Sequence, residues 1–86
     1  MKYKVVYDKA ASKEISKLPK KDVMAIIDKI DTLEDNPRPN GCKKLKGIFE
    51  DLWRIRIGNY RVIYSIEDEI RIVEVRRISH RKDIYQ

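Results

Sequence analysis

The sequence has few of the residues that mark metal, disulfide and phosphate-loop proteins. Its 86 residues include one cysteine, one histidine and three glycines. Cys42 alone permits no intrachain disulfide and no cysteine metal site, so a reducing compartment is the default expectation. A single histidine among scattered carboxylates has no metal-ligand spacing. Gly41, Gly47 and Gly58 form no phosphate-binding fingerprint. We therefore expect no metal and no cofactor.

Long apolar runs are also missing. No stretch approaches the roughly 20 consecutive apolar residues that a membrane-spanning helix needs. Residues 1–4 lead directly into a short β-prone run, without the pattern of a signal peptide. We therefore predict a cytoplasmic protein with no membrane partner.

Charged residues are abundant and lean toward one sign. They make up 40% of the chain and give a formal net charge of +6. Residues 41–86 hold eleven basic and seven acidic side chains, whereas residues 1–40 hold nine and seven. This excess in the second half predicts a basic patch for an anionic partner.

The first half of the chain predicts one short strand and two helices. Residues 3–7 are β-prone. Asp8 is a candidate N-cap, and helical spacing of apolar residues then runs as far as Pro19. A second helix restarts at once, because proline is tolerated in a first turn, and should stop near Asn36. We expect the two helices to form a hairpin with one apolar seam.

The second half predicts an antiparallel meander. Alternating runs cover residues 51–57, 60–66 and 70–78. Gly58-Asn59 and residues 67–69 make the tight connections between them. A short strand or turn at residues 43–47 precedes them. The chain is therefore expected to be one α+β domain, residues 1–86, with its helices on one sheet face and the other face open.

Arginine is concentrated on these predicted strands, since seven of the eight arginines follow residue 50. In a strand every second side chain points the same way, which places Arg54, Arg56 and Arg61 together on the open face. Guanidinium groups pair bidentately with phosphate oxygens, so nucleic acid is the predicted ligand. The alternative is an ordinary wet sheet face whose arginines pair with Glu67, Glu69 or Glu74.

The C-terminal residues add chemically useful side chains. His80 is the only group whose unperturbed pKa lies near neutrality, and a ring such as Tyr85 can stack on a base. The alternatives are a solvated His80, the commoner state of a lone histidine, and a Tyr85 that packs the chain end onto the domain. The doublet Arg76-Arg77 is expected to mark a bulge or the strand exit. Predicted RNA contacts beyond the catalytic set are Lys43, Lys44, Lys46, Arg76, Arg77 and Lys82.

The motifs together resemble the RelE/ParE superfamily of bacterial and archaeal toxins, over essentially the whole chain. The segments that carry the resemblance are Lys44-Leu45-Lys46-Gly47, Leu52-Trp53-Arg54-Ile55-Arg56, Asn59-Tyr60-Arg61-Val62-Ile63-Tyr64 and His80-Arg81-Lys82-Asp83-Ile84-Tyr85. The resemblance implies the toxin of a type II toxin–antitoxin pair, with a cognate antitoxin as partner. RelE-like members cut mRNA in the ribosomal A site by attack of a ribose 2′-OH on the adjacent phosphate.

The resemblance also implies which residues act. Carried over by position, the catalytic set is Arg54, Arg56, Arg61, His80, Arg81 and Tyr85. This chain departs from the best-known RelE pattern, which has lysines at the first two of these positions. Arginine is effectively always protonated, so neither Arg54 nor Arg56 is a credible general base, and His80 becomes the candidate for proton transfer.

Two other functions remain open at this point. A ParE-like toxin would share the fold and poison DNA gyrase without being a nuclease. A catalytically decayed member would be a plain nucleic-acid-binding domain. His80 and Tyr85 weigh against the gyrase inhibitor, because those members typically lack the C-terminal catalytic set.

Overall fold

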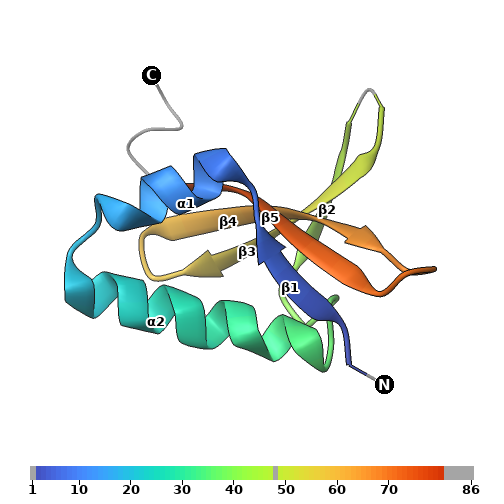
Figure 1. Ribbon diagram of the computed structural model, residues 1–86, viewed down its shortest axis with the longest axis horizontal. Coiled ribbons are helices and arrows are strands. Elements are labelled where there is room, and N and C mark those ends of the chain that lie inside the picture. The colour runs from blue at the N-terminus through green and yellow to red at the C-terminus, as the bar shows by residue number, and fades with distance from the viewer. Residues whose placement is uncertain (1, 48, 81–86) are drawn as a thin grey trace.

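A computed structural model describes residues 2–47 and 49–80 of the chain (Figure 1). The predicted order of elements is confirmed: one strand, a helical hairpin, then strands. The elements are β1 (Lys4–Tyr7), α1 (Lys9–Ser16), α2 (Lys20–Asp31), a 3₁₀ turn (Thr32–Glu34), β2 (Lys43–Lys46), β3 (Asp51–Ile57), β4 (Tyr60–Glu67) and β5 (Ile72–His80).

The strands form one mixed sheet in the order β1-β5-β4-β3-β2. The predicted meander is confirmed, because β2 through β5 pair antiparallel with their neighbours in sequence. The first strand instead pairs parallel with the last, with Lys4 opposite Ile72. The α+β fold with a mostly antiparallel sheet is therefore as expected.

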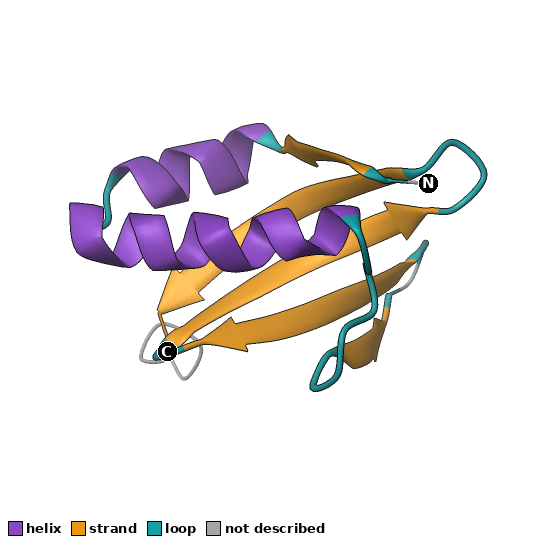
Figure 2. Cartoon of the chain, turned by 90° about the horizontal axis from the view of Figure 1, so that it is seen from below, coloured by secondary structure: helices purple, strands orange, loops and turns teal. Residues whose placement is uncertain are grey.

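Both helices cover one face of the sheet, as predicted, and leave the other without a helix (Figure 2). The core lies between these layers. Its fully buried side chains are Ala11, Ile26, Ile30, Leu33, Val62, Tyr64, Val73 and Val75. Burying one valine, leucine or isoleucine side chain contributes about 1.5–3 kcal/mol. The contact of these side chains between the helices and the sheet is therefore the main stabilising contact between the two layers.

The helix ends agree with the sequence in position and differ in detail. Asp8 occupies the N-cap position of α1 with extended backbone, but its side chain makes no capping hydrogen bond. Pro19 lies just before α2 rather than in its first turn, which suits its fixed φ equally well. The helical segment ends with the 3₁₀ turn at Glu34, close to the expected stop near Asn36.

The hairpin connections explain where the strands begin and end. Gly58 has φ 58°, and Asn59 is not among the positive-φ residues, which fits a type II′ turn between β3 and β4. The next connection is longer than predicted, because Arg71 adopts φ 54° and cannot continue a strand. The start predicted at residue 70 is therefore wrong, and β5 runs from Ile72 to His80.

A β-bulge in β5 confirms the expectation placed on the arginine doublet. Val75 lies opposite Tyr64, whereas Arg77 lies opposite Ile63, so Arg76 is the extra residue. A bulge shifts the alternation of side chains by one position. Ile78 consequently points into the core, where it is 3% exposed, although strict alternation from Val75 would turn it outward.

Within the described part of the chain, neither helix is long and apolar enough to cross a membrane.

Candidate nucleic-acid interface

Four cations share the sheet face that the helices leave open, and we call them the arginine face: Lys43, Arg54, Arg56 and Arg61. The strand register places them there. Lys43 on β2 lies opposite Arg54 on β3, and Arg56 on β3 lies opposite Arg61 on β4. Directly opposite side chains lie about 5 Å apart at Cβ and point the same way. The predicted clustering of Arg54, Arg56 and Arg61 on one face is therefore present.

The described residues do not neutralise the arginine face. In residues 2–47 and 49–80, none of its four cations has a carboxylate within ion-pair distance. Partial burial lowers the pKa of Arg54, and the charges of Arg56 and Arg61 lower it further. The Arg54 Nε is buried without a hydrogen-bond partner in the same part of the chain. A buried, unsatisfied donor among repelling cations suits an anionic ligand.

The arginines of this face can bind and stabilise negative charge but cannot remove a proton. A small hollow of about 50 Å³ lies at the β3–β4 turn and is lined by Arg56, Gly58, Asn59, Tyr60 and Arg61. Guanidinium groups on opposite strands can both reach an oxyanion placed there. A guanidinium group is effectively always protonated in proteins, so arginine cannot serve as the proton acceptor.

Arg76 does not belong to the unpaired cluster. Its Nη2 lies 2.7 Å from a carboxylate oxygen of Glu50, and its Nε lies 2.8 Å from one of Glu74. The alternative of a solvent-exposed sheet face, whose arginines pair with nearby glutamates, therefore holds for Arg76 and its partner Glu74. Its assignment as an RNA contact stays a prediction, which would require RNA to compete with two carboxylates.

Arg77 is held by α1 in a similar way. Its Nη2 donates to Glu14 Oε2 at 2.9 Å, while the backbone N–H of Ile78 donates to Glu14 Oε1 at 2.9 Å. The partner strand β1 reaches only as far as Val75 along β5. Glu14 therefore covers the open edge of β5 beyond that point, which is a common protection for unpaired strand edges.

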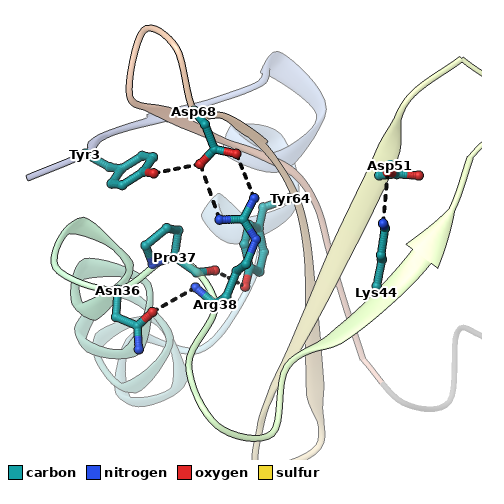
Figure 3. A network of polar contacts seen from close by, with 8 residues as sticks. All are labelled: Tyr3, Asn36, Pro37, Arg38, Lys44, Asp51, Tyr64 and Asp68. Carbon is teal, nitrogen blue, oxygen red and sulfur yellow. Dashed lines mark hydrogen bonds and ion pairs between the residues drawn. The ribbon is translucent and has the colours of Figure 1, made fainter.

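Lys44 and Lys46 lie on the opposite face from Lys43. Lys44 is opposite Trp53, and its Nζ lies 5.8 Å from the indole centroid. The same Nζ pairs with Asp51 at 3.2 Å (Figure 3). Lys46 lies opposite Asp51 in the register. The structure therefore separates two of the four lysines predicted to contact RNA from the arginine face.

A polar network connects the loop after α2 to the β4–β5 turn and to the residue just before β1 (Figure 3). Arg38 donates to both carboxylate oxygens of Asp68, at 3.3 and 2.8 Å, and the Tyr3 hydroxyl donates to the same carboxylate at 2.7 Å. The buried Tyr64 hydroxyl donates to the Pro37 carbonyl at 2.7 Å. These bonds fix the loop that leads into β2.

His80 lies on the helix-covered side and not among the arginines. It is opposite Tyr60, with ring centroids 5.2 Å apart in an edge-to-face arrangement. The bulge at Arg76 is the reason, because it turns His80 inward and leaves Ser79 opposite Arg61. Arg81, Lys82 and Tyr85 of the predicted site lie outside the described residues.

Sequence reasoning missed Asp22, which accepts a 2.7 Å hydrogen bond from the Tyr60 hydroxyl. The two residues are far apart in the chain, and nothing in the local pattern of either one signals the contact. Within the described residues, no group of three or more His, Cys, Asp or Glu side chains could hold a metal ion.

Comparison with known proteins agrees with this architecture. Residues 5–85 match the family described as ParE toxin of the type II toxin–antitoxin system parDE. RelE1 of Methanocaldococcus jannaschii is 35% identical, and the alignment covers 100% of this chain and 98% of that protein.

Two solved structures are also similar. The archaeal RelE–RelB complex from Pyrococcus horikoshii has a TM-score of 0.82 at 33% identity, covering 94% of this chain and 97% of that chain. The RelBE2 toxin–antitoxin complex of Mycobacterium tuberculosis has a TM-score of 0.81 at 28% identity, covering 94% and 100%.

Proposed function

Because this chain belongs to the ParE toxin family of type II toxin–antitoxin systems, we propose that it acts as a ribosome-dependent mRNA endonuclease. The proposed reaction is attack of a ribose 2′-OH on the adjacent phosphate, which gives a cyclic phosphate and a 5′-OH end. It requires a proton acceptor for the 2′-OH, a donor for the leaving oxygen and stabilisation of the charged phosphorane.

The observation that carries the proposal is the arginine face. Three guanidinium groups on neighbouring strands repel one another and have no internal counter-charge in the described chain. Such an arrangement lowers fold stability and is retained where function uses it. Bound phosphates would supply the missing negative charge, and the same groups would stabilise the phosphorane as its charge develops.

Each predicted catalytic residue keeps a defined role in the proposal. Arg54, Arg56 and Arg61 bind and orient the phosphates. His80 is the candidate for proton transfer, and its position requires the RNA to approach from the Tyr60 side of β4 around the end of the sheet. Arg81 is assigned to the leaving oxygen, and the terminal Tyr85 completes the set by its resemblance to the family.

We also infer an antitoxin partner that covers the arginine face when the toxin is inactive. The Pyrococcus and Mycobacterium relatives were solved with their antitoxins. Acidic side chains of an antitoxin would provide the carboxylates that the described residues do not supply to Lys43, Arg54, Arg56 and Arg61.

The experiment is primer extension on mRNA translated in a reconstituted system with purified protein. We expect ribosome-dependent cleavage within codons, lost on Arg61→Ala and reduced on His80→Gln. Arg71→Ala is the matched control, because Arg71 is exposed in the β4–β5 turn at the other end of these strands. Intact mRNA together with undiminished translation would refute the proposal.

A second function has one specific observation in its favour, since the matching family is described by the ParE toxin of parDE. A gyrase supercoiling assay separates the two. Inhibition of supercoiling without mRNA cleavage would identify a ParE-like toxin with the same fold.

A further inference from the structure

A second hollow lies on the helix-covered side of the β3–β4 turn. Its volume is about 330 Å³, near the lower end of small-molecule pockets. Ile26 of α2 and Ile57 of β3 give it apolar walls, while Asp22, Asn59, Tyr60 and His80 bring polar groups. The arginine face does not use this hollow, since it lies across the sheet from those cations.

The polar groups of this hollow suit a donor-rich ligand. The Tyr60 hydroxyl donates to Asp22 Oδ2 at 2.7 Å, and this bond raises the pKa of Tyr60 above its ordinary value. It fixes the carboxylate, leaves Oδ1 with no hydrogen-bond partner within residues 2–47 and 49–80, and leaves Oδ2 with the capacity to accept a second hydrogen bond. Among residues 2–47 and 49–80, no Lys or Arg lines this hollow, so it suits neutral donors more than phosphate.

The two hollows meet at the same turn. Gly58, Asn59 and Tyr60 line both the 330 Å³ hollow and the 50 Å³ hollow of Arg56 and Arg61. One nucleotide carries a phosphate and a base within a few ångströms of each other. An RNA strand whose phosphate lies between the two arginines can therefore extend its base around the turn.

We propose that the hollow beside Asp22 is a guanine-binding site that selects the RNA base next to the phosphate held by Arg56 and Arg61. The inference rests on the proposed function, because it takes RNA as the ligand of the arginine face. Guanine alone among the four bases presents two adjacent donors, N1–H and N2–H₂, on its Watson–Crick edge. A carboxylate accepts two parallel donors bidentately.

The other three bases fit this carboxylate less well. Adenine and cytosine each present one amino donor beside a ring nitrogen that accepts, and that nitrogen would face an Asp22 oxygen. Uracil presents one N–H between two carbonyl oxygens. Stacking on the Tyr60 or His80 ring is available to every base and therefore adds affinity without selectivity.

The test is a titration of the full-length, ¹⁵N-labelled protein followed by NMR. The probes are 2′-O-methyl trinucleotides AGA, AAA, ACA and AUA, which cannot be cleaved because the attacking hydroxyl is blocked. We expect AGA to bind roughly 5- to 100-fold more tightly than the others and to shift the amide signals of residues 22, 59 and 60.

Asp22→Asn should bring the four affinities within about threefold, because an amide offers one acceptor and one donor. Its Oδ1 can still accept from Tyr60, so the fold should be kept, which thermal unfolding verifies. Asp28→Asn removes an equal charge from an exposed position on the same helix and should leave the guanine preference unchanged. Guanosine and adenosine, which lack phosphate, probe the hollow without the arginine face.

The outcomes separate this inference from the proposed function. Equal binding of all four trinucleotides, with affinity that falls in Arg61→Ala, overturns the guanine site and leaves RNA binding intact. A guanine preference that survives Asp22→Asn also overturns it. Shifts at residues 22, 59 and 60 with N-acetyl-arginine amide, but with neither nucleoside, would show a protein-docking hollow instead. RNA affinity unaffected by Arg61→Ala contradicts the proposed function, while a guanosine-specific shift at residue 22 still supports the site.

Discussion

Arg56→Glu should stabilise the fold while it abolishes toxicity. Arg56 lies directly opposite Arg61 across β3 and β4. Cross-strand charge pairs contribute about 0.2–1 kcal/mol, favourable for opposite signs and unfavourable for like signs. The substitution removes a repulsion and adds an attraction, so the two contributions add. Because Arg56 is exposed, solvent screening favours the lower half of the range for each contribution. The two contributions together should then raise the free energy of unfolding by about 1 kcal/mol.

A gain of that size is measurable in a chain of 86 residues. It corresponds to a rise in Tm of about 4–8 °C for a domain of this length. Calorimetry in about 10 mM salt would show it best, because the Debye length is then about 30 Å and falls to about 3 Å at 1 M. Arg56→Gln removes the repulsion only and should give about half the rise.

Lys4→Glu is the charge-matched control. Lys4 is exposed on the edge strand β1 opposite Ile72, far from the arginine face, and it makes the same change in net charge. An equal rise in Tm for Lys4→Glu and Arg56→Glu would assign the effect to overall charge. A fall in Tm for Arg56→Glu, or a rise that persists at 1 M salt, would refute local repulsion on this face.

Two further predictions concern the loop after α2. Tyr64→Phe removes the buried hydrogen bond to the Pro37 carbonyl and should lower the free energy of unfolding by about 0.5–1.5 kcal/mol, as measured by urea denaturation. An unchanged free energy of unfolding would mean that water takes the place of the hydroxyl. Hydrogen bonds from Arg38, then Tyr3, lower the pKa of Asp68 from 3.8 to about 2, so the native state favours its ionised form. The stability it adds is present above about pH 4 and is lost as pH falls toward 2, so the Tm difference between wild type and Asp68→Asn should shrink over that interval.

The sequence predicted the arrangement of elements because periodicity is a local property. Alternation over residues 51–57 placed Arg54 and Arg56 on one face and Ile55 on the other, and the sheet has them there. The Gly58-Asn59 pair located the hairpin that brings Arg61 beside them. These inferences required only the neighbouring residues and a single strand period.

The remainder of the site depends on features without a local signal. The arginine doublet indicated the bulge at Arg76. The alternation beyond residues 51–66 did not predict that this bulge turns His80 toward the helix-covered side. The contact between Asp22 and Tyr60 depends on how α2 lies across the sheet, and no pattern within either segment encodes it. The Glu50 carboxylate beside Arg76 and the Glu14 carboxylate beside Arg77 likewise come from a distant loop and from α1.

The parallel pairing of β1 with β5 sets when this protein can finish folding. Lys4 meets Ile72, a separation of 68 residues, and β5 is also the strand that connects β1 to the rest of the sheet. At about 5–20 residues per second, synthesis delivers the two partners about 3–14 s apart. A nascent chain that has not yet reached Ile72 therefore has no partner strand for β1. A protein proposed to attack translation is thus expected to complete its sheet, and with it its active fold, only after β5 has been synthesised.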